Sequence, residues 1–113
     1  MLISSPVSET RRYLIQILLP VYDKDGQPFG ETVFAPTRAE LTDRFGGLTA
    51  HLRAPARGLW KTGDGTVERD DIAILEVMSE GLDEAWWREY RARLEARFRQ
   101  DVVVVRATAI AVL

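Results

Sequence analysis

The chain has 113 residues, of which 46% are hydrophobic and 28% are charged, and its formal net charge is −2. This length and composition indicate one soluble globular domain that can bury its own core. Nucleic-acid-binding domains usually carry a strongly basic stripe, so we expect no nucleic-acid partner. The chain contains no cysteine, which excludes disulfides, cysteine nucleophiles and thiolate metal sites.

Targeting and membrane segments are not predicted either. The first residues lack the apolar segment of a signal peptide, and no run approaches the roughly 20 apolar residues of a membrane helix. We therefore expect a cytoplasmic protein with no membrane association. Histidine occurs once, as His51, so a site built from several histidines of one chain is impossible. We predict no metal and no cofactor.

The N-terminal half predicts a tail, a strand and a helix. Residues 1–12 form a polar tail, and residues 13–113 form the domain. The run YLIQILL over 13–19 is short and rich in isoleucine and leucine, which favours a buried strand. Residues 21–36 follow as a long connection, because their glycines and prolines oppose a continuous helix.

A short helix is expected next, over residues 38–45. Thr37 and Glu40 have the spacing of a capping box, in which each side chain bonds the other residue's backbone N–H. Gly46 and Gly47 then end the helix, because glycine adopts the left-handed capping conformation at little cost.

The C-terminal half predicts a hairpin, a second helix and a last strand. An irregular strand over 48–61 and a return strand over 66–78 flank the Gly-rich turn at 62–65. Asp83 is a candidate N-cap for a helix that reaches about residue 100. Four large side chains line one stripe of that helix at helical spacing, namely Trp87, Tyr90, Leu94 and Phe98. The last strand covers 102–110.

The order strand, helix, strand, strand, helix, strand is typical of a ferredoxin-like plait. We therefore predict an α+β fold, in which two helices cover one face of a four-stranded antiparallel sheet. The first and third strands should be central.

Alternation of side chains along the strands separates the two faces of the predicted sheet. One set is entirely apolar and is assigned to the helix-covered core. The other set mixes six large aliphatics with three polar residues, Gln16, Glu76 and Arg106. A water-facing sheet surface is normally more polar than this. We therefore expect a second copy to cover the open face, giving a homodimer. The alternative is that the tail or the 21–36 connection covers it.

Glu76 is the residue that most strongly suggests function. A carboxylate within a central strand needs a partner, and Arg106 and Gln16 are the candidates. If the site were enclosed, the pKa of Glu76 would rise, and the residue could transfer protons. A structural ion pair or an interface hydrogen bond is the commoner role and the one we favour.

His51 and Trp60 are weaker candidates. His51 is a weak catalytic candidate beside Glu76, although a single histidine on a strand is more often a surface residue. Trp60 lies near the predicted hairpin and could line a pocket, while packing at an edge is the commoner role. Together with Gln16, Glu76 and Arg106, Trp60 completes the set of candidate ligand-binding residues.

Three segments carry a resemblance to known proteins: FGGLTAHLRAPARGLWK, VERDDIAILEVM and WWREYRARLEARFRQDVVVVRA. They resemble a group of small bacterial hypothetical proteins of unknown function, over most of residues 13–110. The resemblance implies a plait-like fold and assigns no catalytic residue.

Two functional interpretations follow from the sequence. The first is a plait domain of no assignable activity that self-associates through its open sheet face. The alternative is a small-molecule enzyme or ligand-binding protein of the dimeric α/β barrel type, with a cavity over the sheet. A polar-lined cavity of roughly 300 Å³ over the sheet would distinguish the second from the first.

Overall fold

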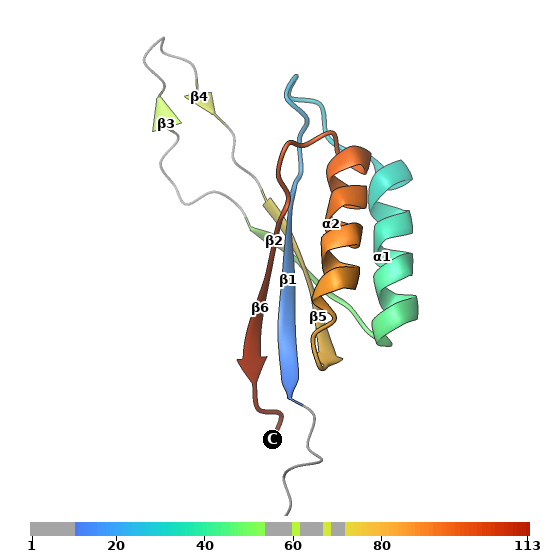
Figure 1. The fold of residues 1–113 in the computed structure, drawn as a ribbon. Helices are drawn as coiled ribbons and strands as arrows, with labels where there is room; N and C mark the ends of the chain where they lie inside the picture. Colours follow the sequence, from blue (N-terminus) through green and yellow to red (C-terminus); the bar gives the residue numbers. More distant parts are fainter. Residues whose placement is uncertain (1–10, 54–59, 62–66, 69–71) are drawn as a thin grey trace, which may run out of the picture.

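The structure is a computed structural model that describes residues 11–53, 60–61, 67–68 and 72–113. The main sheet contains four antiparallel strands in the order β2-β5-β1-β6 (Figure 1). Their bounds are β1 Arg12–Pro20, β2 Thr49–Arg53, β5 Ile72–Glu80 and β6 Val104–Ile110. This order places β1 and β5 in the centre, as the ferredoxin-like prediction required.

Both helices, α1 Glu31–Phe45 and α2 Glu84–Arg97, lie on the same side of the sheet (Figure 1). The core lies between the helices and the sheet. The strand residues predicted to face the helices are buried there apart from Val105, which is half-buried, and Ile15, Ile17 and Leu19 on β1 are fully buried. The division of the strands into two faces is therefore confirmed. Neither of the two described helices lies over the opposite face of the sheet.

Helix α2 follows the sequence prediction closely. The side chain of Asp83 accepts a hydrogen bond from Trp86 N at 3.1 Å, which is the predicted N-cap. The predicted stripe of Trp87, Tyr90, Leu94 and Phe98 is buried along its whole length.

Helix α1 begins seven residues earlier than predicted, and Pro36 lies inside it. The capping-box interpretation is wrong, because Thr37 is interior and its Oγ1 donates to Val33 O at 2.7 Å. Such a bond back to the preceding turn lets a threonine occupy a helix interior. Pro36 is tolerated because it is exposed, so water can reach the Thr32 carbonyl that has lost its helical donor. The predicted stop is confirmed, since Gly46 caps the helix with φ of 76°.

The predicted hairpin is divided between two sheets. Strand β2 ends at Arg53, and β5 begins at Ile72. Between them β3 Trp60–Lys61 and β4 Val67–Glu68 pair antiparallel as a separate two-stranded sheet. The predicted turn at 62–65 lies outside the described residues. The predicted strands over 48–61 and 66–78 therefore join the main sheet only through Thr49–Arg53 and Ile72–Glu80.

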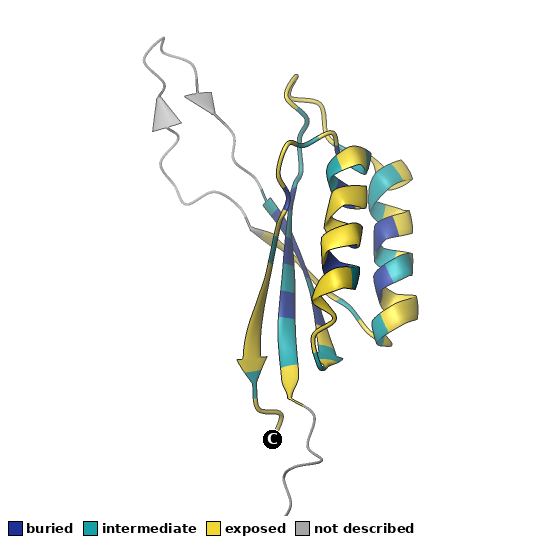
Figure 2. Ribbon diagram, viewed as in Figure 1, coloured by how far each residue is buried: buried dark blue, intermediate teal, exposed yellow. Residues whose placement is uncertain are grey.

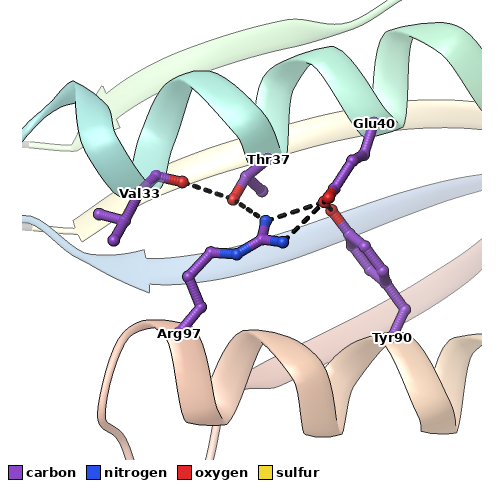
Figure 3. A network of polar contacts seen from close by, with 5 residues as sticks. All are labelled: Val33, Thr37, Glu40, Tyr90 and Arg97. Atoms are coloured by element: carbon purple, nitrogen blue, oxygen red, sulfur yellow. Dashed lines mark hydrogen bonds and ion pairs between the residues drawn. The ribbon is translucent and has the colours of Figure 1, made fainter.

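A part-buried polar network joins the two helices (Figure 3). Arg97 on α2 donates from Nη1 and Nη2 to the Glu40 carboxylate on α1 at 2.8 and 2.9 Å. The same Nη1 donates to Thr37 Oγ1, and the Tyr90 hydroxyl donates to Glu40 Oε1 at 2.9 Å. Bidentate arginine–carboxylate pairs fix relative orientation as well as adding energy. The network therefore sets the position of α1 against α2.

Candidate functional site

A row of polar residues crosses the open face of the sheet, with one residue on each strand. Glu76 on β5 pairs in register with Thr49 on β2 and with Gln16 on β1. Gln16 in turn pairs with Arg106 on β6. Directly paired residues of antiparallel strands share a face, so these four side chains lie on the open side. We call Thr49, Glu76, Gln16 and Arg106 the polar row.

Hydrogen bonds connect the polar row from end to end. Arg106 Nε donates to Gln16 Oε1 at 2.7 Å, and Gln16 Nε2 donates to Glu76 Oε2. His51, on β2 beside the row, lies with Nε2 2.8 Å from Glu76 Oε1. An ionised carboxylate only accepts hydrogen bonds, so His51 Nε2 carries the proton of this contact. Glu76 thus has one donor on each oxygen.

The pKa of Glu76 is lowered, so the rise that an enclosed proton-transfer site would require does not occur. The hydrogen bond from Gln16 is the main cause, and the bond from His51 adds to it, while partial burial acts in the opposite direction. The Glu76 side chain is 18% exposed, and the two hydrogen bonds to its charged form outweigh the effect of its partial desolvation. Glu76 is therefore an anion at neutral pH and a poor proton acceptor.

The partners of Glu76 are also corrected in part. Gln16 and Arg106 were both candidates, but Arg106 contacts Gln16 rather than the carboxylate. The reason is the strand order, because β1 separates β5 from β6. The amide of Gln16 accepts from one side and donates to the other, and so relays the orientation of Arg106 to Glu76.

Aliphatic side chains flank the polar row on both sides. Ile74, Leu18 and Val104 form the next row toward one end of the strands, and Leu14 and Met78 lie toward the other. Ile74 is buried, whereas Val104 and Met78 are 47% and 57% exposed. The site therefore presents one anion between two apolar surfaces.

The sequence brought together most of this site but not all of it. Gln16, Glu76, Arg106 and His51 were candidates and lie together in the structure. The side chain of Trp60 lies outside the described residues, so its candidacy stays a prediction. Thr49 was missed, and only the register of β2 against β5 places it opposite Glu76.

Two described cavities lie away from Glu76. One, of about 140 Å³, is lined by residues that include Asp23, Phe29 and Arg99, near the C-terminal end of α2. The other, of about 270 Å³, lies between β6 and α2. Neither includes Glu76 or Gln16 among its lining residues, whereas Arg106 of the polar row lines the second.

The described residues contain no group of three or more histidine, aspartate or glutamate side chains arranged to hold a metal ion. No helix among them is both long enough and apolar enough to cross a membrane.

Comparisons with known proteins give a fold and one named enzyme. No family model and no curated protein sequence matches the chain. Among solved structures, a phage SAM lyase in complex with S-methyl-5'-thioadenosine matches with a TM-score of 0.53 and 14% identity, over 87% of this chain and 81% of that one. A phage SAM lyase in its apo state matches with a TM-score of 0.50 and 16% identity, over 95% and 86%. At such identities the likeness establishes a shared fold.

These neighbours overturn the first functional interpretation of the sequence. A plait domain with no assignable activity, acting only through self-association, was wrong as the preferred choice, because both solved neighbours are structures of a small-molecule enzyme. One of them holds a small molecule. The alternative interpretation, a small-molecule enzyme or ligand-binding protein, is the better supported one.

Proposed function

We propose that the protein binds a small sulfonium compound of the S-adenosylmethionine class on the open face of its sheet and acts on it as a lyase. The observation that carries the proposal is the Glu76 carboxylate, which is held ionised between two aliphatic surfaces. The likeness to phage SAM lyase supports the choice of ligand class.

The electrostatics of Glu76 suit a cation that forms no hydrogen bonds. A carboxylate has about four lone-pair positions, and Gln16 and His51 occupy two of them. The remaining oxygen surface is free to contact a positive charge. The aliphatic neighbours Leu18 and Met78 match the methyl and methylene groups that surround a sulfonium. Burying these groups would add to the charge attraction.

Arg106 supplies a charge of opposite sign at the other end of the polar row. Its Nε is used by Gln16. No contact within the described part of the chain engages its Nη nitrogens, which can therefore bind a carboxylate. One strand separates β6 from β5, so the two backbones are about 10 Å apart. This spacing suits a zwitterionic ligand whose cation contacts Glu76 and whose carboxylate contacts Arg106.

The lowered pKa of Glu76 limits its part in the reaction. Cleavage of a carbon–sulfur bond leaves the electron pair on sulfur as a neutral thioether. The carbon fragment then either loses a neighbouring proton or is captured by its own carboxylate. Glu76 is a poor base for the first route, since proton acceptors work best with a pKa near the operating pH. Its role is to bind and orient the cation.

A second copy over the open face would enclose the site. Val104 and Met78 remain exposed beside the polar row in a single chain. Covering them would exclude water from Glu76, and charge interactions strengthen where water is excluded. A homodimer is therefore part of the proposal. The cytoplasmic location stays a prediction, which fractionation of the host cell would check.

The test compares two ligands and two variants. Calorimetry with S-adenosylmethionine and with its uncharged thioether S-adenosylhomocysteine measures the contribution of the sulfonium charge. Glu76→Gln removes the anion, and Glu80→Gln is the matched control, because Glu80 is an exposed carboxylate on the same strand and face. We expect binding of the sulfonium to weaken at least about tenfold in Glu76→Gln only.

Mass spectrometry of the reaction mixture tests the lyase activity separately. Release of S-methyl-5'-thioadenosine by wild type, reduced in Glu76→Gln, is the expected result. Equal affinity for both ligands, or an unaffected Glu76→Gln, would overturn the assigned site. Binding without release of the thioether would overturn the lyase assignment alone.

A further inference from the structure

The edge strand β6 has almost none of the features that usually keep an exposed edge from pairing. Edge strands are normally protected by charged residues, proline or a bulge. Residues 102–113 read VVVVRATAIAVL and contain one charged residue, Arg106, and no proline. Figure 2 shows β6 exposed along nearly its whole length. One side of its backbone pairs with β1, and no strand within the described residues pairs with the other side.

An apolar groove with a basic rim runs beside this edge. It has a volume of about 270 Å³ and lies between β6 and α2. Its floor is apolar and comes from Ile15, Trp87, Val105 and Ala107. The charged residues that line it are Glu84, Arg88 and Arg91 of α2 and Arg106 of β6.

The two rim arginines are only loosely held. Arg88 lies 3.6 Å from Glu84 and Arg91 lies 3.9 Å from Glu95, and both arginine side chains are about half exposed or more. Exposed ion pairs at such distances contribute little to stability. Glu95 also accepts a hydrogen bond from Val103 N at 3.0 Å, so its carboxylate is already engaged. Both arginines can therefore turn to a new acidic partner at little cost.

We propose that β6 and this groove bind an extended acidic segment of a partner protein, which adds to the sheet as a fifth strand. Its backbone would pair with the free edge of β6, as in other cases of strand addition. Every second side chain would face α2, about 6.8 Å from the next on that face. An apolar side chain there fits the groove, and an acidic one reaches Arg88 or Arg91.

Charge favours this occupant over a second copy of the chain. Pairing of two β6 strands about a two-fold axis at the groove would place Arg88 and Arg91 of both copies close together. Juxtaposed like charges oppose association, whereas an acidic strand neutralises them. The groove lies on the α2 side of β6 and Glu76 lies on the open face, and Arg106 is the one residue of the polar row that also lines the groove.

The probe for this proposal is a capped ten-residue peptide of alternating valine and glutamate, labelled for fluorescence anisotropy. Its two controls are the valine–lysine peptide, which reverses the charge, and the same acidic peptide N-methylated at alternate residues, which cannot pair. The protein variant is Arg88→Glu with Arg91→Glu. Arg93→Glu is the matched control, because Arg93 is on the same helix but does not line the groove. Circular dichroism checks that each variant is folded.

We expect the acidic peptide alone to bind. Its affinity should fall about tenfold or more in the double variant, remain close to wild type in Arg93→Glu, and weaken in high salt. Amide hydrogen exchange should show new protection in β6 on binding. Equal binding of the lysine peptide or of the N-methylated peptide would overturn the proposal. Protection of β6 amides by self-association without peptide would overturn it in favour of a second copy.

Discussion

His51 Nε2 lies 2.8 Å from Glu76 Oε1, and this contact ties the edge strand β2 to the central strand β5 on the open face. The His51 side chain is 52% exposed and that of Glu76 is 18% exposed, so the contact lies at the boundary between the sheet and solvent. Among the described residues, the polar contact of the His51 ring is with Glu76. His51 is a positioning residue for the carboxylate.

Replacing His51 should therefore be visible in the titration of Glu76. In His51→Ala the carboxylate keeps only the Gln16 hydrogen bond, so its pKa should rise toward the ordinary value of a glutamate. His51→Gln supplies an amide donor and should restore part of the lowering. NMR titration of the Glu76 carboxyl carbon measures both variants. The loss of stability should be about 1 kcal/mol or less, as for an exposed hydrogen bond. An unchanged pKa in His51→Ala would contradict this role.

Acid should destabilise the fold through Glu76 and Glu40. Both carboxyls have a lowered pKa in the folded protein, Glu76 through Gln16 and Glu40 through Arg97. Their contribution to stability is complete above the ordinary glutamate pKa and is lost as the pH falls through the lowered folded values. Urea unfolding at a series of pH values below 6 should show this loss. Glu40→Gln and Glu76→Gln should each weaken the dependence of the unfolding free energy on pH. An unchanged pH dependence in both variants would contradict the role of these two carboxyls.

The fold was predictable from sequence because its signals are local and repeated. Alternation in YLIQILL separated Ile15 and Ile17 from Gln16, and helical spacing identified the stripe that begins at Trp87. The start of α1 was not predictable in the same way. Thr37 and Glu40 have the spacing of a cap, but the side chains from α2 that bind them are 50 to 60 residues away in sequence. Tertiary contacts there overrode a local pattern.

The candidate site was predictable as a face but not as a network. Alternation assigned Glu76 and Arg106 to one side of the sheet. The strand order then determined that Gln16 lies between them, and the register of β2 determined that Thr49 lies opposite Glu76. The direction of the Glu76 pKa shift depended on those contacts, since hydrogen bonds and burial act in opposite directions. Composition alone could not decide which was larger.

The bond network between the helices should respond differently to two conservative changes. Arg97→Lys keeps the charge but loses the bidentate contact with Glu40, and should cost about 1–3 kcal/mol. Tyr90→Phe removes one hydroxyl donor and should cost about 1 kcal/mol. Burial and the adjacent Glu40 raise the pKa of the Tyr90 hydroxyl. The hydroxyl therefore stays protonated and donates its hydrogen bond at neutral pH. Urea unfolding measures the loss of stability in each variant. Equal losses would argue that the bidentate Arg97–Glu40 pair is no stronger than the hydrogen bond from Tyr90.

Leu18→Lys should prevent the proposed homodimer without unfolding the chain. Leu18 is half-buried on the open face beside the polar row, between Ile74 and Val104. A lysine there can extend its ammonium into water in a single chain but not within a covered apolar interface. Light scattering across a dilution series should give a dimer near twice 12.8 kDa for wild type and a monomer for the variant. The same mass for both proteins, with unchanged circular dichroism, would exclude Leu18 from an interface.

Pro36→Ala should stabilise the protein. Pro36 is the sixth residue of α1 and is exposed, and it cannot donate to the Thr32 carbonyl one turn earlier. Alanine restores that donor, and proline is about 3 kcal/mol less favourable than alanine in a helix interior. Proline also restricts the unfolded chain, which offsets up to about 1 kcal/mol of this gain. Because the helix has already adapted to the proline near its first turn, we expect a net gain of about 1–2 kcal/mol by urea unfolding.

Ala39→Gly, at an exposed position in the same helix, should instead lose about 1 kcal/mol and serves as the control for helix formation in this segment. A loss of stability in Pro36→Ala, with the expected loss in Ala39→Gly, would mean that the proline ring makes a contact that outweighs the missing hydrogen bond.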